Sequence, residues 1–400
     1  MTQPFPFDPF DPAFFGDPYP AYRKLRHEHP VFRCDIEDPQ VFPHYWMLSR
    51  AQDVDDALQD WQTYSSAAGT LIDTDISLIP PNMFNMDPPR HDELRAILAR
   101  VLTPARVASL EREVRESAQA LLAPARDGEA FDAATDYAQR IPTLTMCALM
   151  DLPTSDRAQF LQWNLDTLAD GDFTGPKALN AYAEMDTYWK GLVAERRTRR
   201  GEDLISQILH NQTPGQELSD AEIAGFCSLL LDASQNTTMN MITHAILALA
   251  QFPAERAKVA KAPDRWPGAI EELLRFVSPV QGLARATTRD VRLHGVTIPA
   301  GDPVLMLYGS ANHDETVFER PEVLDFEREV RTHWAFGRGI HFCLGNAAAR
   351  LEIRVALEEL IAAFPHYHYE EDRIVRNQLV PTRGVANAPI EFAPNPTEPS

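Results

Sequence analysis

The sequence predicts a mainly helical chain with a smaller β portion. The helical part is predicted from a long helical pattern that runs from Ser219 to Phe252 and from mostly helical patterns over Pro104–Arg200. The strands are predicted from the alternation of apolar and polar residues within Ser278–Met306. With 400 residues, of which 44% are hydrophobic, the chain can bury a large core. We expect one domain over residues 1–400, with an extended N-terminal arm over residues 1–20.

The composition argues against several classes of function. A net charge of −21 is unfavourable for general nucleic-acid binding. No apolar run is long enough to span a bilayer, and the N-terminus lacks the basic and apolar regions of a secretory signal. The four cysteines are far apart, which suits a reducing compartment. We therefore expect a cytoplasmic protein that binds neither nucleic acid nor membrane.

The first hundred residues combine helices with strand-like segments. Helical patterns cover Ala21–His29 and Ala51–Ala57, whereas Val31–Phe32 and Val41–Leu48 have strand character and indicate a small sheet. The stretch Ala67–Met86 is irregular but contains many apolar residues. Loops of this length are usually functional or disordered, and the apolar content argues against disorder.

A basic pair marks the helix that begins at Asp87. His91 and Arg95 are four residues apart, so both point to one face of that helix. Taken alone, such a pair is more often a solvated basic face than part of a site. Further along, Asp136–Met150 is apolar almost all round, which is expected of a buried helix.

The longest helical pattern begins at the capping box that Ser219 and Glu222 form and ends before a proline. Its middle carries Ser234, Asn236 and Thr237, and polar residues inside a central helix need a reason. One interpretation is that the hydroxyls bond back to the preceding turn and bend the helix. The other is that these residues serve a site.

Cys343 comes directly before a helical pattern over Leu344–Phe364, where helix-start N–H groups favour a thiolate. A buried structural cysteine is the ordinary interpretation of a lone thiol. Glycines that allow a flat ligand to approach the backbone, together with His341, favour a ligand site instead. After this helix, Val375–Phe392 reads as a hairpin with Gly384–Ala386 at its turn.

The segment Ala335–Arg354 reads A-F-G-R-G-I-H-F-C-L-G-N-A-A-A-R-L-E-I-R. Its F-G-x-G-x-H-x-C-x-G pattern, which includes Gly345, resembles the haem-binding loop of the cytochromes P450, here residues 335–346. The resemblance implies the cytochrome P450 fold and one haem b (iron protoporphyrin IX), with Cys343 as the axial thiolate on the iron. It also implies that Phe336 packs beside the sulfur and that His341 bonds a haem propionate.

Three further segments resemble the same family. D-P-P-x-H-x-x-x-R implies that His91 and Arg95 reach the propionates, and Arg285 matches a further propionate-binding arginine. The resemblance also implies that the E-x-x-R pair of Glu272 and Arg275 locks to a later arginine, Arg328. In the central helix, L-L-D-A-S-Q-N-T resembles the family's oxygen-binding segment, A-G-x-(acid)-T.

That alignment gives the polar residues of the central helix their implied roles. Thr237 is the hydroxyl that hydrogen-bonds dioxygen, Ser234 replaces a glycine, and Asn236 replaces the acid thought to supply protons. The missing carboxylate leaves the proton route open.

The resemblance also indicates an apolar pocket. Its candidates come from the irregular loop, the central helix, the region before Arg285 and the last hairpin: Leu78, Ile79, Met83, Phe84, Leu230, Ala233, Val280, Leu283 and Val385. For any single loop residue, a role in anchoring the loop to the core is an equal alternative.

Together these features indicate a monomeric monooxygenase. It would insert one atom of O2 into an apolar small molecule, by hydroxylation or O-dealkylation, using electrons from NAD(P)H through a ferredoxin and ferredoxin reductase. One alternative is a peroxygenase that uses hydrogen peroxide, which Asn236 mildly favours. A haem-thiolate gas sensor is another, although a sensor would need neither Thr237 nor an apolar pocket.

Overall fold

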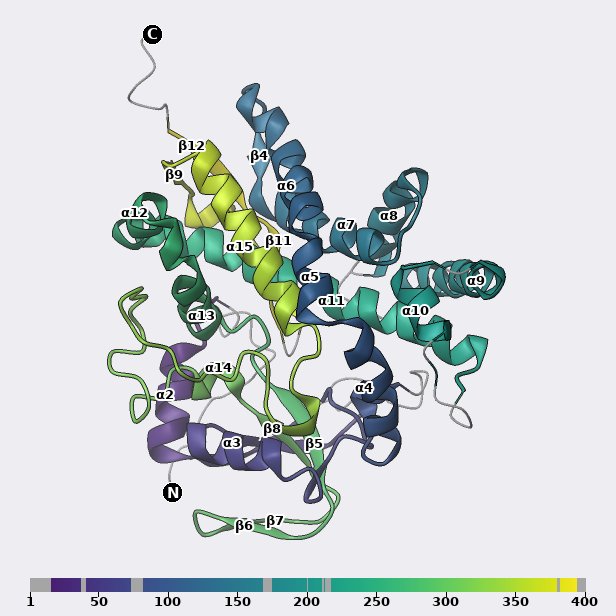
Figure 1. Ribbon diagram of the computed structural model, residues 1–400. Coiled ribbons are helices and arrows are strands. Elements are labelled where there is room, and N and C mark those ends of the chain that lie inside the picture. Colours follow the sequence, from purple (N-terminus) through teal and green to yellow (C-terminus); the bar gives the residue numbers. More distant parts are fainter. Residues whose placement is uncertain are drawn as a thin grey trace. The chain divides into compact units, whose positions relative to one another are not determined.

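The computed structural model describes residues 16–36, 41–72, 82–167, 175–199, 201–210, 212, 217–379 and 382–393. The chain forms two compact units (Figure 1). Unit 1 comprises Met1–Asp92, Gly268–Cys343 and Arg376–Gly384, and unit 2 comprises Glu93–Pro267, Leu344–Val375 and Val385–Ser400.

Unit 1 is built on a five-stranded mixed sheet. Its strands lie in the order β1 (Val31–Asp35), β2 (His44–Leu48), β8 (Pro303–Met306), β5 (Leu283–Thr287) and β3 (Tyr64–Ser65). Only the β2–β8 pairing is parallel. The predicted sheet near the start of the chain is confirmed, and it includes strands from the later β region.

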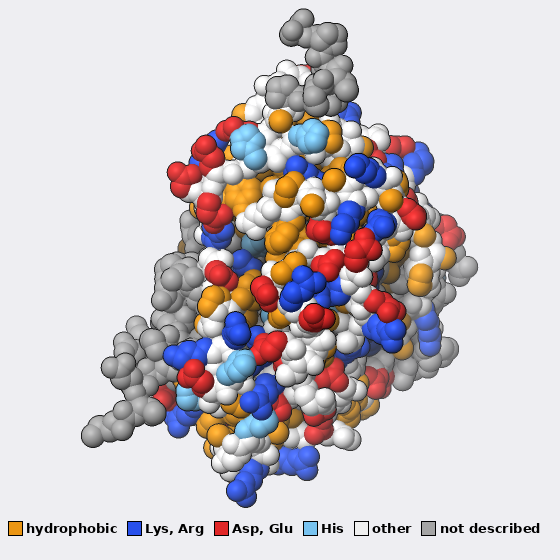
Figure 2. All heavy atoms as spheres, turned by 90° about the vertical axis from the view of Figure 1, so that its left-hand side faces the viewer, with side chains coloured by type: hydrophobic (Ala, Val, Ile, Leu, Met, Phe, Trp, Pro, Cys, Tyr) orange, Lys and Arg blue, Asp and Glu red, His pale blue; other side chains and the backbone are white. Residues whose placement is uncertain are grey.

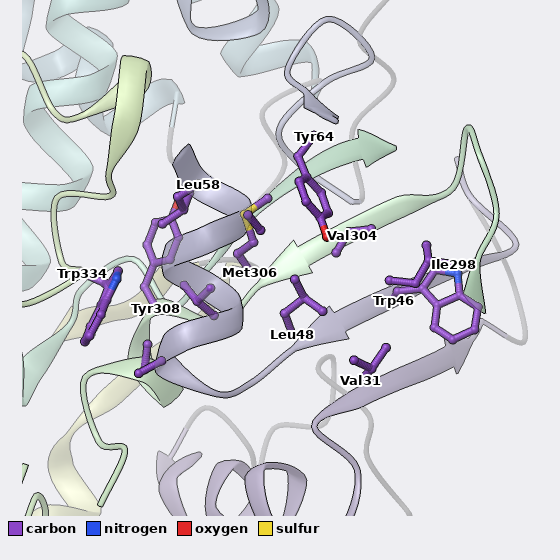
Figure 3. Close-up of a cluster of buried hydrophobic side chains, with 14 of the residues drawn as sticks. Val31, Trp46, Leu48, Leu58, Tyr64, Ile298, Val304, Met306, Tyr308 and Trp334 are labelled. Atoms are coloured by element: carbon purple, nitrogen blue, oxygen red, sulfur yellow. The ribbon is translucent and has the colours of Figure 1, made fainter. Parts of the chain in front are cut away.

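A cluster of buried apolar side chains packs over this sheet (Figure 3). Its two tryptophans donate hydrogen bonds to acids: Trp46 Nε1 donates to Asp302 Oδ2 at 2.8 Å. Similarly, Trp334 Nε1 donates to Asp55 Oδ1 at 2.9 Å. The cluster therefore buries large rings without leaving either indole N–H unsatisfied.

Short elements complete unit 1. They are α2 (Tyr19–Glu28), α3 (Ala51–Gln59), η2 (Met83–Asn85), the hairpin β6 (Val291–Leu293) and β7 (Val296–Ile298), α14 (Tyr308–Ala311) and η7 (Gly339–His341). Four elements have residues in both units: α4 (Arg90–Val101), α13 (Trp266–Val277), β10 (Val375–Leu379) and β11 (Thr382–Asn387).

A buried ion cluster holds the segment that leads to Cys343. Glu272 accepts from Arg275 Nε at 2.7 Å and Nη2 at 2.8 Å, and from Arg328 Nε at 3.2 Å. Arg275 also donates to the carbonyl oxygens of Asn312 and Pro321, each at 2.9 Å. The predicted triad is confirmed, and because a lone buried charge is costly, its members stabilise the fold only together.

Unit 2 is almost entirely helical. It contains α5 (Pro104–Ser109), α6 (Glu111–Arg126), α7 (Arg140–Leu149), α8 (Arg157–Thr167), α9 (Pro176–Thr198), α10 (Leu204–His210), α11 (Asp220–Gln251), α12 (Pro253–Lys261) and α15 (Asn346–Ala363). Short helical turns and strands join them: β4 (Phe131–Asp132), η3 (Ala133–Ala138), η4 (Thr154–Asp156), η6 (Pro263–Arg265), β9 (Tyr367–His368), η8 (Glu371–Arg373) and β12 (Pro389–Phe392). Among the described residues, no helix combines the length and the apolar content needed to cross a bilayer.

The 32-residue helix α11 is the longest element of unit 2 in the described chain. Its predicted capping box is confirmed: Ser219 and Glu222 exchange side-chain and backbone hydrogen bonds. α15 packs against both α11 and α6 (Figure 1). These helices bury each other's apolar faces, which makes α11 a rigid support for the polar residues at its middle.

Two predicted elements differ from the structure. The helix expected over Asp136–Met150 is divided into a π-helical turn, η3, and α7. Pro142 has no N–H to donate, so it is tolerated only in the first turn of a helix, which is where α7 places it. Gly384–Ala386 lies within β11 rather than at a turn, so that turn prediction is wrong.

Candidate functional site

The loop before Cys343 is closed by its own backbone. The Cys343 N–H donates to the Phe336 carbonyl at 2.9 Å, and Phe342 N–H donates to Gly339 at 3.1 Å. Gly337 and Gly339 both have φ of 66°, a left-handed conformation that favours glycine. A Cβ atom at Gly339 would lie 2.3 Å from the Leu58 carbonyl oxygen, so any larger residue would push the loop away from α3.

The helix after the loop begins later than predicted. α15 starts at Asn346 with Gly345 as its N-cap, instead of at Leu344. Cys343 therefore precedes the first helical turn, and its own N–H is already bonded to Phe336.

Two predicted propionate partners come together in unit 1. The His91 and His341 rings lie 4.3 Å apart between centroids, although 250 positions separate them in sequence. His341 Nε2 is 3.0 Å from Ser66 Oγ, and His91 Nδ1 is 2.8 Å from Asp92 Oδ1. These bonds hold both imidazoles in place. The contact between Ser66 and His341 was not predicted, because no local pattern links the two residues.

Arg285 lies on β5 with only 5% of its surface exposed. Its Nη1 donates to the neighbouring Ala284 carbonyl at 2.6 Å, and no carboxylate among the described residues is within ion-pair distance of it. Burial lowers its pKa. A buried cation without a paired anion is costly, so this guanidinium suits an acidic group other than the carboxylates of the described residues.

The fourth predicted propionate partner is Arg95, on α4. It lies one helical turn after His91, as the spacing predicts, and its side chain is half-buried. Arg95 belongs to unit 2 and His91 to unit 1.

The hydroxyls at the middle of α11 bond back to the helix. Ser234 Oγ donates to the Leu231 carbonyl at 2.9 Å, and Thr237 Oγ1 donates to the Ala233 carbonyl at 2.8 Å. α11 nevertheless remains helical over its whole length. The back-bonds are therefore present, and each hydroxyl oxygen retains lone pairs that can accept a further hydrogen bond.

Asn236 is held by a neighbour that the sequence analysis missed. Asn240 Nδ2 donates to Asn236 Oδ1 at 2.9 Å, and Asn240 Oδ1 accepts the Val385 N–H at 3.1 Å. Because a backbone N–H can only donate, it fixes which end of the Asn240 amide is oxygen. The four-residue spacing of the two asparagines was the available sequence signal.

The pocket candidates divide between the two units. Leu78 and Ile79 lie outside the described residues. Met83 and Phe84 (in η2), Val280 and Leu283 are half-buried in unit 1, and in unit 2 Leu230 is half-buried and Ala233 is exposed. Val385 is completely buried within β11, so its side chain is not accessible as the predicted turn position would require.

A separate cleft of about 350 Å³ occurs in unit 1. It is lined by Asp53, Asp56, Ala57, Asp60, Thr63, Tyr64, Arg289, Asp290, Val291, Arg292 and Leu293. None of the predicted site residues lines it. Several of its acids are already paired, for example Asp53 with His294 at 2.8 Å, and we assign it no part in the reaction.

The thiol, the buried guanidinium and the adjacent imidazoles together fit an iron porphyrin bearing carboxylates. A cysteine can ligate haem iron, while Arg285 and the two histidines can pair with propionates. The comparisons with known proteins agree. The cytochrome P450 family model matches residues 267–392, which include Arg285 and Cys343.

Similarity to individual proteins extends over nearly the whole chain. "Putative cytochrome P450 123" of Mycobacterium tuberculosis is 35% identical over 394 residues, covering 96% of each chain. "Vitamin D(3) 25-hydroxylase" of Pseudonocardia autotrophica is 35% identical over 395 residues, covering 97% of this chain and 96% of that protein. The solved structure of the bacillaene polyketide synthase cytochrome P450 PksS of Bacillus subtilis 168 has a TM-score of 0.89 at 30% identity, covering 97% of this chain and 100% of that one.

Proposed function

Because the chain belongs to the cytochrome P450 family and is a monooxygenase of that family, we propose that it holds haem b through Cys343. It would insert one atom of O2 into an apolar small organic molecule, by hydroxylation or O-dealkylation. The observation that carries the proposal is the combination, within unit 1, of the glycine-shaped Cys343 loop with the buried Arg285, which forms no ion pair with a described residue.

Each residue of this site has a distinct task. Cys343 ligates the iron, and Phe336 packs beside its sulfur. The glycines of the loop, Gly345 included, leave room for a flat macrocycle. The propionates are held by charge-assisted hydrogen bonds from His91, Arg95, Arg285 and His341. Haem b, when bound, supplies the activation of O2 that protein side chains cannot provide.

α11 supplies the polar groups for oxygen activation. Thr237 already donates to Ala233, so its oxygen is positioned to accept a hydrogen bond from a water or to hold one in place. Asn236 cannot release and regain a proton as a carboxylate does. Ser234, three residues earlier, offers a second hydroxyl that can hold water near Thr237. Protons therefore reach the site through water rather than through Asn236.

In this proposal the protein is a cytoplasmic monomer with a single domain over residues 1–400. Its electrons come from NAD(P)H through a separate ferredoxin and ferredoxin reductase. Arg354 on α15, which could attract an acidic ferredoxin, has little free charge. Arg354 pairs with Glu111 at 2.7 Å and with Glu358 at 3.1 Å. On the face in Figure 2, basic and acidic side chains are interspersed. Steering of an acidic partner by Arg354 is therefore weak.

A peroxide-using enzyme is the second candidate, and the amide at Asn236 favours it. Hydrogen peroxide brings both electrons and protons with the oxygen, so the missing acid would not matter. A ligand screen by haem difference spectrum first identifies a substrate. Turnover of that substrate is then compared with peroxide alone and with NAD(P)H, ferredoxin and reductase.

The two candidates and the gas-sensor alternative predict different results. The proposed monooxygenase forms product efficiently only with the electron-transfer proteins and O2. Faster turnover with peroxide alone would favour the peroxygenase, and turnover under neither condition would contradict both enzymes and leave the sensor.

A further inference from the structure

The middle of α11 has an accessible strip. Residues Ile223–Cys227 are mostly buried and Thr238–Leu249 are buried throughout, but between them only Leu231 and Gln235 are buried. The remaining side chains from Ser228 to Thr237 are half-buried, except Ala233, which is exposed. A long helix that is buried at both flanks and accessible at its middle offers that middle to a small molecule.

Asp232 lies on this strip without a partner. Its carboxyl is half-buried and makes no hydrogen bond or ion pair with any described residue. Burial alone raises its pKa to about 7. Buried polar groups in proteins are normally satisfied, so an unsatisfied carboxyl in such a position needs a reason.

A second unsatisfied polar group faces it from α9, which packs against α11 within unit 2. The Tyr182 hydroxyl makes no hydrogen bond with the described residues, and its pKa is raised by burial and then by the charge of Asp232. The two groups are thus close enough to interact electrostatically, yet they are not bonded to each other.

The surroundings define the chemistry of a ligand that binds to the strip. Leu229, Leu230 and Ala233, which adjoin Asp232 on the strip, are apolar, while Ser228 and Asn236, one turn away, are polar but uncharged. Because Ser228–Thr237 contains no lysine or arginine, this carboxyl gains most from a cation that the ligand brings. A neutral ligand without a hydrogen-bond donor would leave the carboxyl as poorly satisfied as before.

We propose that Asp232, assisted by the Tyr182 hydroxyl, anchors the basic nitrogen of an amine-bearing apolar substrate. This inference rests on the proposed function, since it concerns which molecules the same monooxygenase accepts. Asp232 acts as a specificity-determining residue: it holds one end of the substrate on α11 while the apolar part extends along the strip.

The test measures affinities of the haem-loaded protein by calorimetry, with two probes that differ in the basic nitrogen. The probes are N,N-dimethyldecylamine and its neutral analogue decyl methyl ether. In Asp232→Asn the Kd for the amine should rise about tenfold or more, because a charge-assisted bond is lost. The Kd for the ether should change by less than about threefold. Tyr182→Phe should weaken amine binding less than Asp232→Asn does.

The matched control is Asp186→Asn on α9. It removes the same charge from an exposed acid that pairs with Lys190, and it should leave both affinities unchanged. Equal amine affinity in wild type and Asp232→Asn, or equal loss for amine and ether, would overturn the anchor.

Oxidation of the probes by wild type with ferredoxin, reductase and NAD(P)H separates the two proposals. Binding without any oxidation would contradict the proposed function, while the affinity comparison would still decide the role of Asp232.

Discussion

The Asn240 side chain donates a 2.9 Å hydrogen bond to the side-chain oxygen of Asn236, one turn earlier on α11. The Val385 N–H fixes the orientation of the Asn240 amide, so Asn240 can only donate to position 236. The fold therefore directs a hydrogen-bond donor, Asn240 Nδ2, at the side chain of position 236. A carboxylate would accept the same bond.

Asn236→Asp should consequently fold and bind haem like the wild type. A carboxylate can exchange protons with solvent, so we expect product formation to rise by up to about tenfold and the solvent isotope effect to change. The measurement is single-turnover product formation in H2O and D2O. The control is Asn180→Asp, which makes the same change in charge at an exposed position on α9. An isotope effect identical in wild type and Asn236→Asp would mean that position 236 is not on the proton route.

Thr237→Ala should lower the amount of product formed per NAD(P)H consumed and divert electrons to hydrogen peroxide. The reason is the loss of the hydroxyl that, in our proposal, positions water at the middle of α11. Thr243→Ala is a matched control, because Thr243 makes the same back-bond on the same helix, to Met239 at 2.9 Å, but is completely buried. Equal coupling in the two variants would show that Thr237 is only a structural residue.

Arg285→Ala should weaken haem retention on a desalting column. The loss of one charge-assisted hydrogen bond to a propionate costs about 1–3 kcal/mol. Arg289→Ala, which removes an exposed arginine that pairs with Asp60 in the same unit, should retain haem fully. Unchanged haem content in Arg285→Ala, and also in the double variant with Arg95→Ala, would argue against the assignment.

Glu352 on α15 predicts a pH-dependent stability. Burial raises its pKa to about 8, and its Oε2 has no partner among the described residues. The folded state therefore holds a proton that the unfolded state releases above about pH 4.3, so this group lowers the stability as pH rises towards 8.

Between pH 6 and pH 8 that loss amounts to about 2 kcal/mol of unfolding free energy. Glu352→Gln should remove it, and the stability advantage of the variant should grow from pH 6 to pH 8. Thermal unfolding at both pH values measures this difference. A variant that loses stability with pH as steeply as the wild type does would contradict the assignment.

Local rules explain which parts of the fold were predictable. The capping box at Ser219, the end of α11 before Pro253 and the glycines of the Cys343 loop each depend on residues a few positions apart. The Glu272, Arg275 and Arg328 triad was predicted only because the family resemblance supplied the distant third member.

Contacts between distant segments could not be predicted in the same way. Ser66 meets His341 across 275 positions, and Val385 meets Asn240 across 145, with no periodicity to signal either contact. Val385 was misplaced for this reason: glycine at position 384 suggested a turn, but the pairing of β11 decides the conformation. The lack of a hydrogen-bond or ion-pair partner for Asp232 among the described residues likewise depends on how the helices pack, which sequence patterns do not report.

The carbon monoxide difference spectrum of the reduced protein tests most directly the central proposal, that Cys343 would ligate the haem iron as a thiolate. The wild type should show the red-shifted Soret band of thiolate-ligated haem, and Cys343→Ser should lose that band even where haem remains bound. Cys227→Ser, which changes a buried thiol on α11, should keep it. A wild-type spectrum typical of histidine-ligated haem, or a Cys343→Ser spectrum identical to the wild type, would contradict the account.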